Sequence, residues 1–157
     1  MDREDFSRRV TAMRVGLYRV AASYLRGEED RLDAVAEAIA KGWEKRGTLR
    51  DERLFATWLT RILIRECVNI QRRQRRLIPV ERIPEAPVPL RDERAAVLEE
   101  ALGQLPQRAR TMVVLHYMEG YDVKQIAQMM GTTKGAVCSG LSRARVRLRA
   151  LIGEELE

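Results

Sequence analysis

Apolar residues recur every three or four positions along most of the chain, the spacing at which they share one face of an amphipathic helix. Three such patterns fill the first half, over residues 6–27, 30–46 and 54–75. Three helices of this length bury enough apolar area for a small bundle. The positions predicted to face inward are Phe6, Val10, Met13, Leu17, Val20, Ala21 and Tyr24 in the first; Leu32, Val35, Ala36, Ile39, Ala40 and Trp43 in the second; and Phe55, Trp58, Leu59, Ile62, Leu63, Cys67 and Ile70 in the third.

Helical patterns resume at about residue 92 and continue almost to the end of the chain. The first ends at Leu105-Pro106, and the next is predicted over residues 108–118, ending at Gly120. Patterns typical of strands are nearly absent, so the sequence predicts an all-α fold. The apolar positions of these two helices are Ala96, Leu98, Ala101, Leu102, Met112, Val113, Leu115 and Met118.

Prolines separate the two groups of helices. Four of the five prolines in the chain are Pro79, Pro84, Pro87 and Pro89. A proline-rich segment is extended and semi-rigid, so about sixteen residues at roughly 3 Å each would span on the order of 50 Å, or about fifteen base pairs of duplex. We therefore expect two small helical domains, an N-terminal bundle over residues 1–76 and a C-terminal four-helix domain over residues 93–157, joined by a linker over residues 77–92.

The stretch that begins at Asp122 has the pattern of a helix-turn-helix. Asp122 is placed to cap the first helix, with Gln125 completing a capping box, and Gly131 is placed to end it. Thr132 or Thr133 would cap the second helix. The inward positions are predicted to be Val123, Ile126, Ala127 and Met130 in the first helix and Ala136, Val137, Leu141, Ala144 and Leu148 in the second.

The opposite face of this second helix carries small and polar residues and then arginines. The second helix of such a motif enters the major groove of DNA, and arginines beside it suit phosphates. An ordinary antiparallel helix pair with a solvated arginine face is the alternative, but the joint placing of Ala127, Gly131 and Val137 favours DNA binding. The outward residues are Lys134, Gly135, Cys138, Ser139, Ser142 and Arg143, followed by Arg145, Arg147 and Arg149.

The composition narrows the class of protein. The 157 residues are 33% charged and 45% hydrophobic, and a net charge of +6 favours a polyanionic partner over a merely solvated basic surface. Cys67 and Cys138 lie far apart in apolar helical patterns, which indicates neither a disulfide framework nor a metal cluster and fits a reducing cytoplasm. With no recognisable signal peptide or bilayer-spanning run, we expect a cytoplasmic protein without membrane insertion.

The third predicted helix ends in a basic run. Four arginines within residues 72–76 continue a helix that begins with Phe55 and Trp58 beside a polar loop. Aromatic faces next to a cationic track suit single-stranded nucleic acid, where bases stack and the backbone follows the charge. The alternative is a solvated basic run with both aromatic residues in the core.

Several segments carry a family resemblance when they are read together. They are DRLDAVAEAI (residues 30–39) with Trp43, FATWLTRI (residues 55–62) with Asn69 and Arg72-Arg73, Leu105-Pro106 with Arg108 and Arg110, YMEGY (residues 117–121) with Ile126-Ala127, and GAVCS (residues 135–139) with Leu141, Arg143, Ala144 and Arg145. In this order, with a proline-rich joint between the halves, they resemble the extracytoplasmic-function (ECF, group IV) sigma factors of the sigma-70 family over about residues 6–151.

The resemblance implies a bacterial RNA polymerase sigma factor that directs core polymerase to specific promoters, in a stress or envelope response. It implies no catalytic residues, metal ligands or cofactor. Its partners would be core RNA polymerase, promoter DNA and an anti-sigma protein, and the free chain would be a monomer.

The resemblance also assigns residues to each partner. The second helix would dock on the clamp helices of the polymerase largest subunit through Asp30, Asp33, Val35, Glu37, Ile39 and Trp43. The promoter −10 element would be bound by Arg50, Phe55, Trp58, Arg61, Arg65, Asn69, Arg72 and Arg73, with the loop over residues 47–54 cradling a flipped base. The −35 element would be read as duplex DNA by Thr133, Lys134, Gly135, Cys138, Ser139, Ser142, Arg143, Arg145 and Arg147.

The recognition helix departs from the family pattern at three positions. Cys138 and Gly140 stand where the family often has basic residues, and Ser142 replaces a common histidine. Fewer cationic contacts should weaken −35 binding or shift its sequence preference. Gly140 also costs roughly 1 kcal/mol of helix propensity relative to alanine, and it would allow close approach either to DNA or between helices.

Two other functions compete with this interpretation. A DNA-binding repressor would use the same helix-turn-helix with an N-terminal dimerisation or effector bundle, and it predicts a stable dimer on a symmetric operator. An enzyme acting on nucleic acid would need clustered carboxylates, a metal site or an activated nucleophile. His116 is the only histidine and lies in an apolar stretch, and the carboxylates Asp30, Asp33 and Glu37 on one helix face are more typical of a solvated or protein-binding surface.

Overall fold

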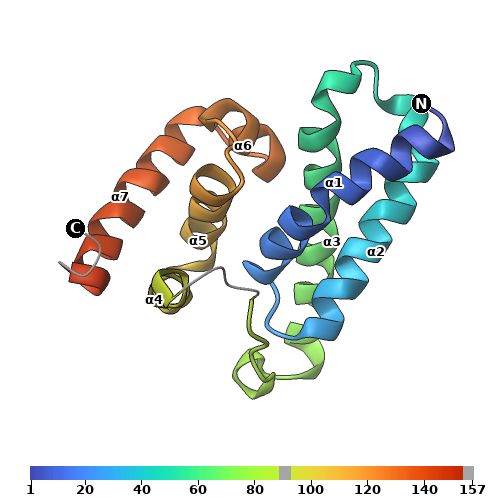
Figure 1. Ribbon diagram of the computed structural model, residues 1–157. Helices are drawn as coiled ribbons and strands as arrows, with labels where there is room; N and C mark the ends of the chain where they lie inside the picture. The colour runs from blue at the N-terminus through green and yellow to red at the C-terminus, as the bar shows by residue number, and fades with distance from the viewer. Residues whose placement is uncertain (89–92, 154–157) are drawn as a thin grey trace.

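The structure, a computed structural model, describes residues 1–88 and 93–153. The N-terminal half contains α1 (Arg3–Ala22), α2 (Glu28–Glu44), the 3₁₀ turns η1 (Arg46–Thr48) and η2 (Glu52–Leu54), and α3 (Phe55–Leu77) (Figure 1). After the turn η3 (Val80–Arg82), the C-terminal half contains α4 (Glu93–Gly103), α5 (Gln107–Val113), the π-helical turn η4 (Val114–Met118), α6 (Val123–Met130) and α7 (Lys134–Ile152). The described residues include no strand, and the all-α prediction is confirmed.

The three N-terminal helices pack around an apolar core. α1 begins after Asp2, whose carboxylate accepts the Asp5 backbone N–H at 2.8 Å and so satisfies one of the unpaired donors at the helix start. The ring of Phe6 lies edge-on to those of Trp43 and Phe55, with centroids 5.3 and 5.7 Å away. This arrangement is one that aromatic pairs prefer, and it fixes the end of the bundle where α2 passes into α3.

The inner face of α2 differs from the prediction. Its buried residues are Arg31, Ala34, Ala38 and Gly42, whereas Leu32, Ala36 and Ala40 are exposed. The cause is close helix packing: a Cβ on Gly42 would lie only 2.9 Å from the Leu59 Cδ1 atom of α3. Small side chains therefore set the orientation of α2. A prediction from hydrophobicity alone places the buried face of this helix about one residue away from where it lies.

The helix-turn-helix has the predicted caps. Asp122 accepts the backbone N–H of Gln125 at 2.8 Å, and the Gln125 side chain accepts that of Asp122 at 2.9 Å, which completes a capping box. Gly131 ends α6 with φ 64° and ψ 41°, a left-handed conformation that favours glycine. Thr133 caps α7, where its hydroxyl accepts a backbone N–H at 3.1 Å.

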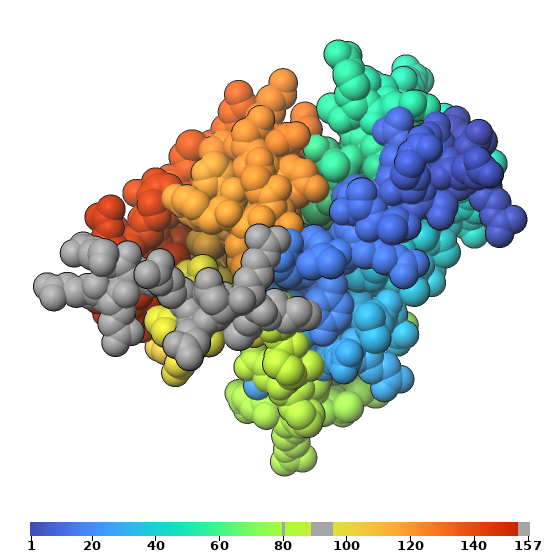
Figure 2. Space-filling view, viewed as in Figure 1, coloured from blue at the N-terminus to red at the C-terminus, as the bar shows by residue number. Residues whose placement is uncertain are grey.

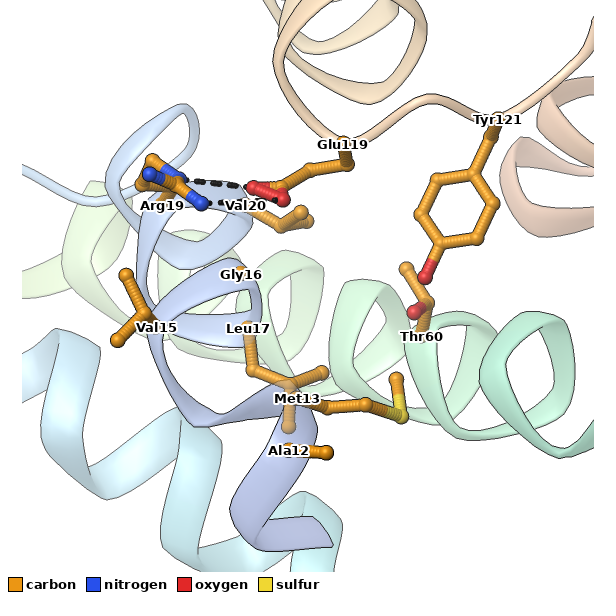
Figure 3. Close-up of a pocket in the computed structure, with 10 residues that line it drawn as sticks. All are labelled: Ala12, Met13, Val15, Gly16, Leu17, Arg19, Val20, Thr60, Glu119 and Tyr121. Carbon is orange, nitrogen blue, oxygen red and sulfur yellow. Dashed lines mark hydrogen bonds and ion pairs between the residues drawn. The ribbon is translucent and has the colours of Figure 1, made fainter. Parts of the chain in front are cut away.

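The helix predicted over residues 108–118 changes its winding halfway. After α5 the chain makes the π-helical turn η4, in which the Glu119 N–H donates to the Val114 carbonyl five residues earlier at 3.0 Å. The extra residue per turn alters the direction of the chain that follows. Glu119 and Tyr121 then point toward α1 and α3 (Figure 3).

The two halves of the chain lie against each other (Figures 1 and 2). α3 packs against α6 and α1 against η4, so the buried residues of both halves form one continuous core. Of the linker predicted over residues 77–92, Leu77 belongs to α3 and residues 89–92 lie outside the described residues. Residues 83–88 are bound to the N-terminal half instead of extending away from it, because the Ala86 N–H donates to the Arg26 carbonyl at 2.7 Å.

Candidate nucleic-acid and polymerase interface

One side of α3 is exposed and carries a row of polar side chains. Arg61, Arg65, Asn69 and Arg72 recur every three or four residues, the spacing of neighbours on one helix face, and Arg73 lies beside them. The buried residues of α3 pack against α1, α2 and α6. Five of the residues predicted to contact the −10 element are thus gathered on one surface.

The two aromatic residues predicted for the same surface lie differently. Phe55 is 4% exposed, with its ring between those of Phe6 and Trp58. Trp58 is only partly buried. Phe55 therefore supports this surface from the core and offers no ring face to a base. This agrees with the alternative, stated above, that both aromatic residues belong to the core. We leave Phe55 out of the interface proposed below.

The loop between α2 and α3 is held by a residue of α1. The Arg9 guanidinium donates to the Glu52 carbonyl at 3.0 Å and to the Glu52 carboxylate at 3.1 Å. The amino group of Met1 lies 3.9 Å from the same carboxylate. Sequence periodicity could not reveal this pair, since 43 residues separate Arg9 from Glu52.

Contacts at both ends of the loop restrict it further. At its start, the Arg46 guanidinium lies 3.6 Å from the Trp43 ring centroid and donates to the Trp43 carbonyl at 2.7 Å. At its end, Asp51 accepts the Arg53 backbone N–H at 3.0 Å and the Arg53 side chain at 3.1 Å, and this side-chain hydrogen bond lowers the pKa of the Asp51 carboxyl. Arg50, predicted to contact DNA, is exposed between these fixed points.

The exposed face of α2 combines carboxylates with a shallow apolar strip. Asp33 and Glu37, predicted to contact polymerase, are exposed. Leu32 is 52% exposed, and Ala36 and Ala40 continue the strip one and two turns along the helix. Sequence reasoning missed these three residues as surface residues because it assigned them to the core.

The remaining residues predicted for the polymerase surface are less accessible. Val35, Ile39 and Trp43 are partly buried against the core of the N-terminal half. Asp30 is also partly buried, and its carboxylate accepts a hydrogen bond from the Gln74 side chain of α3. Of the three acidic residues predicted for this surface, Asp33 and Glu37 are therefore better placed than Asp30 to meet a partner.

The outward face of α7 carries every residue predicted to read the −35 element. The helix is buried along Val137, Leu141 and Ala144, and Gly140 also faces inward, where a Cβ would lie 3.3 Å from the Met112 Cε atom of α5. Nine residues are exposed on the other side: Thr133, Lys134, Gly135, Cys138, Ser139, Ser142, Arg143, Arg145 and Arg147.

The described residues hold no candidate metal site beside these surfaces. No group of three or more His, Cys, Asp and Glu side chains is placed to hold a metal ion in the described part of the chain. The His116 Nδ1 atom lies 2.8 Å from the Tyr121 carbonyl oxygen, a contact that joins η4 to the start of the helix-turn-helix. Among helices within the described ranges, none is long and apolar enough to cross a bilayer.

Comparison with known proteins identifies the family. Residues 10–77 match the family described as Sigma-70 region 2, and residues 95–148 match Sigma-70, region 4. The chain is 34% identical over 140 residues to the ECF RNA polymerase sigma factor SigM of Mycobacterium tuberculosis, an alignment that covers 87% of this chain and 71% of the relative. The chain belongs to the ECF sigma factors of the sigma-70 family. It is therefore a sigma factor that directs core RNA polymerase to promoters and has no enzymatic activity of its own, and a repressor is not favoured.

Other relatives agree with this assignment. The sigma factor is 30% identical over 149 residues to RNA polymerase sigma factor SigV of Bacillus subtilis, with 93% of this chain and 90% of the relative covered. The sigma factor RpoE from Bartonella quintana, solved in complex with the anti-sigma factor NepR, shares the fold with a TM-score of 0.82 at 23% identity, covering 96% of this chain and 98% of RpoE. CnrH, solved with the cytosolic domain of CnrY, gives a TM-score of 0.72 at 25% identity, covering 96% and 89%.

Proposed function

We propose that three exposed surfaces of this sigma factor divide promoter recognition among them. α2 binds core RNA polymerase, α3 with the loop over residues 47–54 binds the −10 element, and α7 binds the −35 element. The observation that supports this division most strongly is the row of Arg61, Arg65, Asn69 and Arg72, which is exposed along the side of α3 opposite its buried residues. A row of cations with one amide suits a nucleic-acid strand better than a protein surface.

The α7 surface suits duplex DNA. Arg145 and Arg147 would contact phosphates, which fix the register of the helix on the duplex. Ser139, Ser142 and Arg143 would reach base edges in the major groove, where each base pair presents a distinct pattern of donors and acceptors. Lys134, Arg143, Arg145 and Arg147 give this face four cations, so part of its affinity should be independent of sequence and should fall as the salt concentration rises.

The α3 surface and its loop suit a strand whose bases have left the duplex. Arg50 and Asn69 would contact the displaced base, and their binding energy would offset an unpairing cost of a few kcal/mol. Arg9 contributes indirectly, because its hydrogen bonds to Glu52 order the loop before DNA arrives. An ordered loop loses less conformational entropy when it binds.

The α2 surface suits a helical partner with basic residues. Ala36 and Ala40 would let a partner helix approach closely, Leu32 would supply the apolar contact, and Asp33 and Glu37 would face cations. Each DNA-binding half has modest affinity alone. Polymerase that holds both halves on one promoter converts the second contact into an intramolecular one and raises its effective concentration.

We also infer that a protein inhibitor holds this sigma factor in the cytoplasm. The sigma factor RpoE, which has the same fold, was solved in complex with the anti-sigma factor NepR, and CnrH, also of this fold, was solved with the cytosolic domain of CnrY. An anti-sigma protein that binds both halves of this chain would keep α2 from polymerase. The inducing signal would then act on that inhibitor.

Transcription in vitro tests the residue assignments. Core polymerase with the wild-type chain is expected to make promoter-specific transcripts from start sites mapped after overexpression. Arg65→Ala/Asn69→Ala should reduce those transcripts by about tenfold or more, since two contacts of order 1 kcal/mol each are lost. Arg14→Ala, which removes an exposed arginine of α1, is the control. The −10 assignment fails if the α3 variant transcribes as well as the control.

A further inference from the structure

A tyrosine just before the helix-turn-helix holds one arginine of α7. The Arg145 guanidinium donates to the Tyr117 hydroxyl oxygen at 2.8 Å, although the two residues lie 28 positions apart in the chain. Tyr117 belongs to the π-helical turn η4 and is 53% exposed, and Arg145 is exposed on the outward face of α7. A long arginine side chain on a helix surface otherwise samples many rotamers. The hydrogen bond therefore gives Arg145 one preferred orientation on the surface proposed to bind DNA.

The Tyr117 ring is itself restrained by the residue before it. The His116 ring lies edge-on to the Tyr117 ring, with centroids 4.8 Å apart and an interplanar angle of 79°. His116 is fixed in turn, because its Nδ1 atom lies 2.8 Å from the Tyr121 carbonyl oxygen. A carbonyl oxygen only accepts hydrogen bonds, so Nδ1 carries the hydrogen. These contacts tie the orientation of Arg145 to the backbone that leads into α6.

Tyr117 orients this cation without cancelling its charge. A guanidinium has several N–H donors, so donation to Tyr117 through one nitrogen atom leaves Arg145 others for a ligand. The Tyr117 oxygen accepts this hydrogen bond and keeps its own hydrogen to donate. A carboxylate in the same place would also orient the guanidinium, but it would compete with an anionic ligand for the charge. A positive charge beside a neutral hydroxyl donor suits a phosphate, whose oxygen atoms accept hydrogen bonds.

The position of Arg145 on α7 also favours a phosphate over a base edge. Successive residues of an α-helix are turned by about 100°, so Arg145 and Arg147 lie on opposite flanks of α7, about 160° apart. Ser139 and Ser142 lie between these flanks and are exposed. When a helix enters the major groove, its central ridge meets the base edges and its flanks face the two sugar-phosphate backbones. Tyr117 therefore holds an arginine that faces one of these backbones.

We propose that Tyr117 and Arg145 form one phosphate-binding site, in which Tyr117 is a positioning residue that holds the guanidinium toward the DNA backbone. The proposal rests on the duplex-binding role proposed above for α7 and assigns it a residue outside that helix. An oriented side chain loses less conformational entropy on binding, so its phosphate contact is stronger. Because a phosphate carries no base identity, the site contributes equally to binding of any duplex sequence.

A double-mutant cycle with the whole chain tests this site. Affinity for a labelled duplex that carries the −35 element of a mapped promoter is measured by fluorescence anisotropy at low salt. Arg145→Ala should lower the affinity about tenfold and reduce the slope of log affinity against log salt concentration by about one, as expected for one lost phosphate contact. Tyr117→Phe, which removes only the hydroxyl, should lower the affinity about threefold. In the Arg145→Ala background Tyr117→Phe should have almost no effect, since the hydroxyl acts through the arginine.

Two matched variants show whether the coupling is specific to this pair. In an Arg147→Ala background, which removes the arginine on the opposite flank of α7, Tyr117→Phe should keep its effect of about threefold. Tyr18→Phe makes the same chemical change in the N-terminal half, at a hydroxyl that accepts from the Arg31 guanidinium at 3.3 Å. Tyr18→Phe should leave the affinity for the duplex unchanged. A general disturbance of the fold by Tyr117→Phe would instead lower the affinity equally in the Arg145→Ala and Arg147→Ala backgrounds.

A scrambled duplex of the same length separates this site from sequence recognition by α7. Equal wild-type affinity for the −35 duplex and the scrambled duplex would reject the proposed reading of the −35 element. The phosphate site instead predicts the same loss of affinity in Tyr117→Phe on both duplexes. It is overturned if Tyr117→Phe or Arg145→Ala binds as tightly as wild type, or if the effect of Tyr117→Phe is just as large without Arg145.

Discussion

Gly140 of α7 lies directly against the buried Met112 side chain of α5, where these two helices pack together. A Cβ at position 140 would lie 3.3 Å from Met112 Cε and nearer still to the sulfur atom. The sequence left two roles open for this glycine, close approach to DNA and close packing of helices. The structure supports close packing of helices. The glycine therefore belongs to the interior of the C-terminal half, and its loss should affect stability before it affects DNA recognition.

Gly140→Ala should destabilise the protein despite alanine's higher helix propensity. Overpacking a buried contact costs about 1–3 kcal/mol, and alanine recovers roughly 1 kcal/mol of propensity. We expect the free energy of unfolding, measured in urea, to fall by about 1 kcal/mol. Gly103→Ala, at an open helical position, is the control and should be neutral or stabilising. A Gly140→Ala variant as stable as the control would mean that Met112 moves aside without cost.

Arg9 should affect −10 binding without touching DNA. Arg9→Ala removes both hydrogen bonds that fix Glu52, so the loop must be ordered when DNA binds. We expect affinity for a single-stranded −10 oligonucleotide, measured by fluorescence anisotropy, to fall about three- to tenfold. Glu52→Ala should have a similar effect, and the double variant should lose little more, since the two residues act through one contact.

The adjacent arginine provides the control for the Arg9 experiment. Arg8 also belongs to α1, but it is 74% exposed and pairs with Asp5 on the surface. Arg8→Ala removes the same charge without releasing the loop. An equal loss of affinity in Arg8→Ala and Arg9→Ala would show that net charge, and not loop order, is responsible.

Leu32 should be a principal contact of the polymerase surface. Leu32→Ser removes an apolar side chain that is 52% exposed, so the free energy of unfolding should change by less than about 0.5 kcal/mol. Affinity for core polymerase, measured by competition with labelled sigma factor, should fall about tenfold if the side chain enters the interface. Val15→Ser, at a 62% exposed apolar position of α1, is the matched control. Unchanged core affinity in Leu32→Ser would remove this residue from the polymerase surface.

Local signals made the helix-turn-helix predictable. A cap such as Asp122 with Gln125, or the glycine turn at Gly131, depends on residues within one helical turn, so the sequence alone specifies it. The buried faces of α1 and α3 follow large apolar residues with helical periodicity. The exposed rows on α3 and α7 lie opposite the buried faces of these two helices, so the same periodicity predicts them.

Contacts set by tertiary packing were not predictable. α2 is oriented by small residues such as Ala38 and Gly42, which hydrophobicity does not distinguish from surface alanines. Two of the four hydrogen-bond acceptors of the buried Arg31 side chain, Ala86 and Pro87, lie in the linker, 55 and 56 residues further along the chain. Arg19 and Glu119 are 100 residues apart, and nothing in either local sequence indicates that they meet.

The two cysteines should differ in reactivity. Cys67 is buried in α3, and burial raises the pKa of its thiol from 9.0 to about 12, whereas Cys138 is exposed on α7. The thiolate is the reactive species, so at pH 8 Ellman's reagent should modify Cys138 promptly in the folded protein and Cys67 only after unfolding in guanidinium. Two rapidly reacting thiols in the folded protein would contradict the burial of Cys67.

The same burial should make the protein less stable at alkaline pH. Between pH 9 and about 12 the unfolded chain releases the Cys67 proton while the folded chain retains it. The unfolded state then binds fewer protons, so the free energy of unfolding falls as pH rises, by at most about 1.4 kcal/mol per pH unit for one group. Tyr24, whose pKa burial raises from 10.0 to about 12, adds to the loss above pH 10. Urea unfolding between pH 8 and 11 measures the slope, which Tyr24→Phe should reduce above pH 10 by removing one titrating group. A wild-type stability that stays level or rises over this range would contradict both pKa shifts.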